Sequence, residues 1–161
     1  MIADLEDYTC LDVATAGTVL IIEDDPDIAE ILRYSLEKET FKTRVAQNGE
    51  EGLYASLDSA NPPSIILLDL LLPGMKGTEI CRRLRRESAT RTTPIIIISA
   101  KAFDNDSLEL GANDYIVKPF SIREVVARVR SLLDHENSCA TATENQRSTA
   151  SPARRWSHSQ S

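Results

Sequence analysis

Three short, almost uninterrupted apolar runs constrain the fold of this chain more than any other feature of its sequence. They are TVLIIE at residues 18–23, SIILLD at 64–69 and PIIIIS at 94–99. A strand with one face in water alternates apolar and polar residues, whereas a run that is apolar throughout is typical of a strand covered on both faces in a parallel sheet. The runs therefore predict a buried parallel sheet.

The segments that separate these runs have the apolar spacing of helices. Apolar residues recur three or four positions apart in four segments, at residues 28–36, 48–57, 80–84 and 125–133. Weaker strands are expected at residues 43–46 and 114–117. Asp27 is expected to mark the start of the first helix, and Ser121 with Glu124 matches a capping box before the last one. Alternating strands and helices predict an α/β fold, a doubly wound five-stranded parallel sheet with helices on both faces.

Charge and composition separate a body from two ends. Residues 1–134 hold 23 acids and 15 bases, and so acidic a body argues against general nucleic-acid binding. Residues 135–161 contain nine Ser or Thr and no Leu, Ile, Val, Phe or Met, so we expect a disordered tail. Residues 1–17 are expected to form a flexible N-terminal extension, which leaves residues 18–134 as the folded domain.

The same composition indicates a cytoplasmic protein without a membrane segment. No apolar run approaches the roughly 20 residues that span a bilayer. The first 17 residues carry four acids and no base, unlike a signal peptide. The three cysteines, Cys10, Cys81 and Cys139, have unrelated spacings and suggest neither a disulfide framework nor a zinc site.

Chemically capable residues follow the predicted strands at the points where they end. In chain order they are Glu23, Asp24, Asp25, Asp69, Ser99 and Lys118, the last followed by Pro119. Ligands of open parallel sheets bind at the carboxyl ends of the strands, so we expect these side chains to gather at one edge. Each alone could be an ordinary loop residue, and Asp25 could simply cap the helix that follows it.

Such a cluster favours phosphoryl transfer with a divalent metal. Two carboxylates about 4 Å apart repel by about 4 kcal/mol at an effective dielectric constant of 20, so Asp24 and Asp69 would favour a cation between them. An all-oxygen set without His or Cys suits Mg²⁺. Lys118 and Ser99 could hold the remaining phosphoryl oxygens. The arrangement is suited to phosphoryl transfer onto a carboxylate nucleophile.

Four motifs in this order resemble the receiver domain of two-component response regulators. They are IIEDD at 21–25, LLDLLLPG at 67–74, IIISA at 96–100 and DYIVKPF at 114–120. The resemblance covers about residues 18–134 and implies a flavodoxin-like fold with strand order 2-1-3-4-5. RVRSLLDHEN at 128–137 resembles the end of a receiver that leads into a winged-helix output domain, yet a Ser/Thr-rich tail follows. A single-domain regulator and a truncated sequence both remain open, and neither supports DNA binding.

The resemblance also implies a role for each matching residue. Asp69 matches the phosphoacceptor that takes a phosphoryl group from a histidine kinase or a histidine phosphotransfer protein. The implied Mg²⁺ ligands are Asp24, Asp69, the backbone carbonyl of Leu71 and, through water, Glu23. Lys118 and Ser99 would contact the phosphoryl group, and Ser99 with Tyr115 would form the switch. The chain would be a signalling phosphoacceptor and not an enzyme, promoting only its own phosphorylation and dephosphorylation.

The segment from Ser99 to Gly111 departs from the family pattern because it is about three residues short. We therefore expect a shortened fourth helix. In the family, the fourth helix, fifth strand and fifth helix form the face that reads out phosphorylation, often as a homodimer. We expect a homodimer through this face to be weakened.

Two other classes of function are weighed against this interpretation. A haloacid-dehalogenase-type phosphatase also uses an Asp nucleophile, Mg²⁺, a hydroxyl residue and a Lys, but it has a second Asp two residues after the nucleophile. Leu71 stands at that place here. The other alternative is a receiver-like module that binds proteins without being phosphorylated.

Overall fold

A computed structural model describes residues 17–100 and 109–134 of the chain. Its single sheet has five parallel strands in the order β2-β1-β3-β4-β5. The strands are β1 (Thr18–Ile22), β2 (Lys42–Ala46), β3 (Ile65–Leu68), β4 (Ile95–Ser99) and β5 (Asp114–Val117). The three apolar runs thus form β1, β3 and β4, which confirms the predicted doubly wound, flavodoxin-like sheet.

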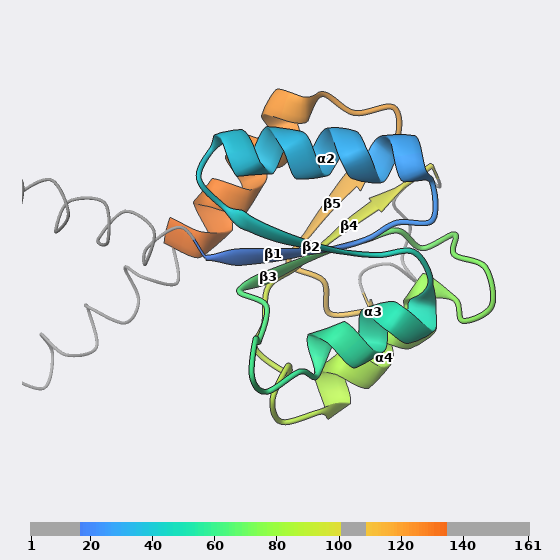
Figure 1. Cartoon of the computed structure of the whole chain (residues 1–161). Helices are drawn as coiled ribbons and strands as arrows, with labels where there is room; N and C mark the ends of the chain where they lie inside the picture. Colours follow the sequence, from blue (N-terminus) through green and yellow to red (C-terminus); the bar gives the residue numbers. More distant parts are fainter. Residues whose placement is uncertain (1–16, 101–108, 135–161) are drawn as a thin grey trace, which may run out of the picture.

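Helices cover both faces of this sheet. The described helices are α2 (Pro26–Lys38), α3 (Gly49–Ser56), α4 (Gly77–Arg86) and a helix over residues 122–134. Figure 1 shows α2 and the 122–134 helix on one face of the sheet, and α3 with α4 on the other. The shortened fourth helix is predicted between Ser99 and Gly111, and residues 101–108 of that segment lie outside the described residues. The predicted flexible ends, 1–17 and 135–161, also lie outside them, except for Gly17.

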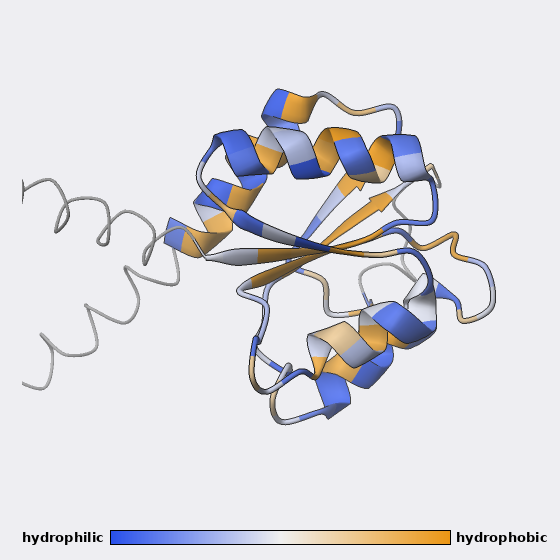
Figure 2. Ribbon diagram, viewed as in Figure 1, coloured by the Kyte–Doolittle hydropathy of each residue, from blue (hydrophilic) through white to orange (hydrophobic). Residues whose placement is uncertain are grey.

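The core consists of two apolar layers, one on each side of the sheet, because successive strand residues face opposite ways. Val19 and Ile21 of β1 belong to the layer under α2 and the 122–134 helix. Leu20 and Ile22 belong to the layer under α3 and α4. Every residue of β3 is buried. Figure 2 shows apolar residues concentrated in the central strands, and apolar and polar residues alternating along the helices.

The start of α2 differs from the sequence-based prediction. Asp25, not Asp27, is the N-cap: its Oδ1 accepts hydrogen bonds from the backbone N–H groups of Asp27 at 2.9 Å and Ile28 at 3.4 Å. Pro26 occupies the first helical position, where its missing N–H has no partner to lose. Asp27 lies in the first turn, where a negative charge is stabilised by the helix dipole. The predicted start at Asp27 was therefore wrong by two residues, and the capping role left open for Asp25 is the one observed.

The helices of the described region are all too short or too polar to cross a membrane.

Candidate functional site

The site lies at the carboxyl edge of the sheet and is built from residues that directly follow the strands. Glu23 follows β1, and its backbone N–H donates to the Ala46 carbonyl at the end of β2. Asp69 follows β3 and donates to the Ile22 carbonyl in the same way. These bonds extend the sheet by one step past the strand ends. The backbone positions of both acids are therefore set by the sheet itself.

Three acids gather at this edge. Glu23, Asp24 and Asp69 each offer a carboxylate oxygen, and these oxygens lie within 4.8 Å of one another. The Glu23 residue is 3% exposed and Asp69 is 4% exposed, while Asp24 faces solvent. The cluster is thus closed on the side of the sheet and open on the side of Asp24. This grouping was predicted from the positions of the acids at the strand ends.

Lys118 reaches the cluster from the end of β5, two strands away from β3 at the same edge of the sheet. Its Nζ lies 3.0 Å from Glu23 Oε2 and 3.0 Å from Asp69 Oδ2. Lys118 follows β5, and β4 separates β5 from β3, so only a long side chain can reach Asp69 from there. The position of Lys118 at this edge was predicted from the sequence, but its pairing with Glu23 was not.

The electrostatics of the cluster are unbalanced. Burial is the largest cause that raises the pKa of Glu23, to about 7; the hydrogen bond from Lys118 opposes the rise and the Asp69 carboxylate adds to it. Burial also acts to lower the pKa of Lys118, but its hydrogen bonds to Asp69 and Glu23 outweigh burial and raise that pKa. Among the described residues, Lys118 is the one base that bonds to these carboxylates. One ammonium therefore faces three acids, and the site favours additional positive charge.

Asp69 is also held from the loop that follows it. Its Oδ1 accepts a hydrogen bond from the Leu71 backbone N–H at 2.9 Å. Gly77, the first residue of α4, packs directly on this loop and donates its N–H to the Leu70 carbonyl at 3.1 Å. A Cβ at Gly77 would lie well inside van der Waals distance of the Asp69 carbonyl oxygen. Gly77 was not predicted as a site residue; the available signal was a glycine three residues before the predicted helical segment at 80–84.

The other candidate residues lie around this cluster. Ser99 is completely buried at the end of β4, and its carbonyl accepts the Lys118 N–H at 2.8 Å. Tyr115 is half-buried on β5 and packs against the apolar layer under α3 and α4. The Leu71 side chain faces solvent and is 61% exposed. Asp25 caps α2, and its N–H donates to Glu23 Oε1 at 3.2 Å, which favours a structural role.

The donor set fits a hard divalent cation. The three grouped side chains are all carboxylates, and Mg²⁺ takes oxygen ligands while keeping several of its waters. Asp24 faces solvent, so a cation at this edge could keep waters on that side. A cation here would also relieve the repulsion among the three acids.

Comparisons with known proteins point to one family. Residues 19–130 match the family model described as the response regulator receiver domain. The response regulator ArlR of Staphylococcus saprophyticus is 44% identical over 118 residues, which are 71% of this chain and 51% of that protein. The sensory transduction protein RegX3 of Mycobacterium tuberculosis is 44% identical over 119 residues, 72% of this chain and 50% of that protein. The chain therefore spans about half the length of the curated relatives it matches.

Solved structures agree with this match. The receiver domain of the Francisella response regulator 1452 has 32% sequence identity and a TM-score of 0.68, covering 74% of this chain and 98% of that one. A CheY-like receiver domain protein from Methanospirillum hungatei has 26% identity and a TM-score of 0.70, covering 76% of this chain and 97% of that one.

Proposed function

Because the chain belongs to the response regulator receiver domain family, we propose that it accepts a phosphoryl group on Asp69 from the phosphohistidine of a histidine kinase or a histidine phosphotransfer protein. The observation that carries this proposal is the setting of Asp69. Its carboxylate is nearly buried, groups with Glu23 and Asp24, and bonds to the ammonium of Lys118. A carboxylate nucleophile beside acids that attract a cation is suited to phosphoryl transfer.

The reaction exchanges one bond to phosphorus for another. An oxygen of Asp69 attacks the phosphorus, the new O–P bond forms as the P–N bond breaks, and the electron pair of the broken bond remains on the imidazole nitrogen. Lys118 holds the phosphoryl oxygen that arrives beside Asp69 Oδ2, where its Nζ already lies at 3.0 Å. The Ser99 hydroxyl, at the neighbouring strand end, donates to a second phosphoryl oxygen.

Asp24, Asp69 and the backbone carbonyl of Leu71 would bind Mg²⁺ directly, and Glu23 through water. When bound, the ion neutralises charge that develops on the phosphoryl oxygens. The raised pKa of Glu23 supports this assignment, because a buried acid that resists ionisation alone becomes easier to ionise beside a cation.

Ser99 and Tyr115 form the proposed switch. Ser99 contacts the phosphoryl group, while Tyr115 on β5 responds by a change of side-chain rotamer. The face that would read this change includes β5 and the 122–134 helix together with the fourth-helix segment. Because that segment is short, we propose that phosphorylation changes the dimer population by less than about tenfold, or about 1.4 kcal/mol.

The direct test is the mass of the protein after incubation with acetyl phosphate and Mg²⁺. The expected product is one phosphoryl adduct, and peptide mapping should place it on Asp69. Asp69→Ala should abolish the adduct, and excess chelator should suppress it. Asp58→Ala is the matched control, because Asp58 is a partly exposed acid that pairs with Arg44 outside the site.

Three results would overturn parts of the proposal. An adduct that forms equally well in excess chelator contradicts the metal role of Asp24 and Asp69. Failure to form any adduct favours a module that binds proteins without phosphorylation. Rapid turnover of a phosphomonoester substrate would instead favour a phosphatase.

A further inference from the structure

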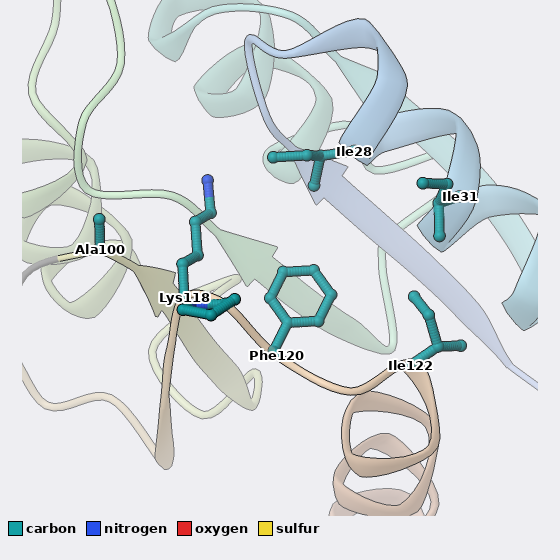
Figure 3. Close-up of a pocket in the computed structure, with 7 residues that line it drawn as sticks. Ile28, Ile31, Ala100, Lys118, Phe120 and Ile122 are labelled. Atoms are coloured by element: carbon teal, nitrogen blue, oxygen red, sulfur yellow. The ribbon is translucent and has the colours of Figure 1, made fainter.

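Two hollows lie along the contact between α2 and the part of the chain that follows β5. Figure 3 shows the first, the pocket beside Lys118, where Ile31 of α2 lies opposite Ile122. The second is a groove of about 660 Å³ that shares Ile122 with this pocket and follows the 122–134 helix to Asp134. Its other wall is the second half of α2, residues 34–39. We call this second hollow the helix groove.

The helix groove is richer in bases than the domain around it. Its walls carry three bases and two acids, namely Lys38, Arg123, Arg130, Glu39 and Asp134. Residues 1–134 as a whole hold 23 acids and 15 bases. Arg130 pairs with Glu39, whereas no acid of residues 17–100 or 109–134 pairs with Lys38 or Arg123. The groove can therefore accept an acidic segment.

The surface of the groove is also partly apolar. Val126 packs against the core layer under α2 and the 122–134 helix, and Ala127 beside it is exposed. Tyr34 is 56% exposed, and the Nζ of Lys38 lies 4.7 Å from the centre of its ring. An apolar side chain gains from leaving water at such a surface. The helix groove thus fits a segment that is both apolar and acidic.

The two ends of the chain differ in how well they match this groove. Residues 1–16 hold six large apolar residues, four acids and no base. The apolar ones are Met1, Ile2, Leu5, Tyr8, Leu11 and Val13, and the acids are Asp4, Glu6, Asp7 and Asp12. Residues 135–161 have three bases, two acids and no Leu, Ile, Val, Phe or Met. The N-terminal segment therefore has the aliphatic side chains and the excess of acids that the tail lacks.

The N-terminal segment also joins the domain at one end of the groove. A Cβ on Gly17 would lie 3.7 Å from Leu133 Cδ1, and Asp134, the next residue, lines the groove. Sixteen extended residues can span about 50 Å, whereas the 122–134 helix is only about 20 Å long. The segment can therefore reach every part of the groove without moving the domain.

We propose that residues 1–16 dock in the helix groove of their own chain. Their apolar side chains lie on Tyr34 and Val126, and their carboxylates lie beside Lys38 and Arg123. This differs from the flexible extension expected from the sequence, because a sequence does not show which surface the segment would meet. The docked segment covers the face formed by α2 and the 122–134 helix, so it competes with any protein that binds there.

The experiment is paramagnetic NMR on the full chain with a nitroxide label on Cys10. In Cys139→Ser the label reacts with Cys10, because Cys81 is completely buried. The label should broaden the methyl signals of Ile122 and Val126 relative to the same sample after the nitroxide is reduced.

Two positions make this result specific. Ile122 lies at the end of the helix opposite to Leu133 and Gly17, so a segment that is only tethered at Gly17 would broaden its signal much less than that of Leu133. Ile80 is buried in α4 on the other face of the sheet, and its signal should be unchanged.

A variant of the groove tests the charge complementarity. Arg123→Glu should lower the ratio of docked to free segment by about fivefold, because an attraction is replaced by a repulsion, and the Ile122 signal should recover. The matched control is Arg82→Glu, which makes the same change at an exposed position of α4 and should leave the broadening as it is.

A variant of the segment tests the apolar contacts without changing any residue of the described domain. Leu5→Ser combined with Leu11→Ser should also restore the Ile122 signal. Ala3→Ser combined with Ala14→Ser introduces the same two hydroxyls in place of small side chains and should not restore it.

Three outcomes would overturn the inference. The first is an Ile122 signal that the Cys10 label does not broaden, or broadens equally in the groove and segment variants. The second is broadening from a label on Cys139 in Cys10→Ser but not from Cys10, which would place the tail in the groove. The third is broadening only between chains, in a mixture of spin-labelled chain and isotope-labelled chain, which would make the occupant a second copy.

Discussion

At the carboxyl edge of the sheet, one ammonium, that of Lys118, lies beside a cluster of three carboxylates. At the amino edge, carbonyl oxygens surround one guanidinium. The second group is Arg85 of α4. Its nitrogens donate to the carbonyls of Gly111 at 2.8 Å, Thr93 at 2.8 Å, Thr90 at 3.2 Å and Arg91 at 3.3 Å, and to Asn113 Oδ1 at 2.9 Å. The same Asn113 oxygen accepts the N–H of Ile95 at the start of β4.

A partly buried cation therefore has a different role at each edge of the sheet. Arg85 donates to carbonyls in the loops before β4 and β5, and so it ties α4 to the entry of both strands. Lys118 faces more negative charge than it can neutralise, and the buried Glu23 carries a raised pKa as a result of its burial. Stability is expected to depend on the amino edge and chemistry on the carboxyl edge. Four predictions test this difference.

The largest effect is expected at the amino edge. Arg85→Met keeps a long apolar stem but leaves several carbonyls without a donor, so we expect a loss of about 3 kcal/mol in the free energy of unfolding, measured by urea titration. Arg82→Met, on the exposed side of the same helix, should change it by less than about 0.5 kcal/mol. Phosphorylation of Asp69 should persist in folded Arg85→Met. Selective loss of phosphorylation with normal stability would contradict the comparison.

The next effect is expected at the carboxyl edge and combines a loss of binding with a gain in stability. Asp24→Asn should weaken Mg²⁺ binding by about 100-fold, or about 2.7 kcal/mol, while raising the melting temperature of the metal-free protein because one of three clustered charges is removed. Melting temperatures over a series of Mg²⁺ concentrations report both quantities. Glu50→Gln removes an exposed acid in the first turn of α3; it should leave Mg²⁺ binding unchanged and should not raise the melting temperature. A metal-free Asp24→Asn that melts below wild type would refute the view that this cluster is destabilising.

A third effect follows from the pKa of Glu23. In the folded metal-free protein this carboxyl keeps its proton until about pH 7, whereas its ordinary value is 4.5. Between these values the folded state binds more protons than the unfolded state, so stability falls as the pH rises. Relative to Glu23→Gln, wild type in excess EDTA should lose about 2 kcal/mol between pH 5 and pH 8. Urea titrations at each pH check this, and parallel pH profiles for the two proteins would contradict it.

The smallest effect is expected for the tail, residues 135–161, which should contribute neither to the stability of the domain nor to the chemistry of the site. Truncation after residue 137 removes no Leu, Ile, Val, Phe or Met, so the free energy of unfolding should change by less than about 0.5 kcal/mol. Phosphorylation of Asp69 should also be unchanged. Differential scanning calorimetry of the truncated and full chains compares their melting temperatures. A loss of several degrees that Trp156→Ala reproduces would show that the tail docks on the domain.

The sequence alone determined the sheet and the place of the acids. Continuous apolar runs are a local property of the chain, and they mark β1, β3 and β4 to within a residue at each end. Because parallel strands share a carboxyl edge, the grouping of Glu23, Asp24 and Asp69 follows from their positions directly after these runs. Such runs can be recognised in one sequence because a strand that is buried on both faces accepts few residue types besides the apolar ones.

Only the tertiary structure decided how those groups interact. Lys118 reaches across β4 to two acids, Gly77 leaves the space in which the Asp69 loop packs, and Arg85 meets four carbonyls. Every residue has a carbonyl, so a sequence does not mark the ones that will need a donor. Likewise, the raised pKa of Glu23 comes from burial by residues that are distant in the chain, and the pocket beside Lys118 exists only where α2 and the segment after β5 are packed side by side.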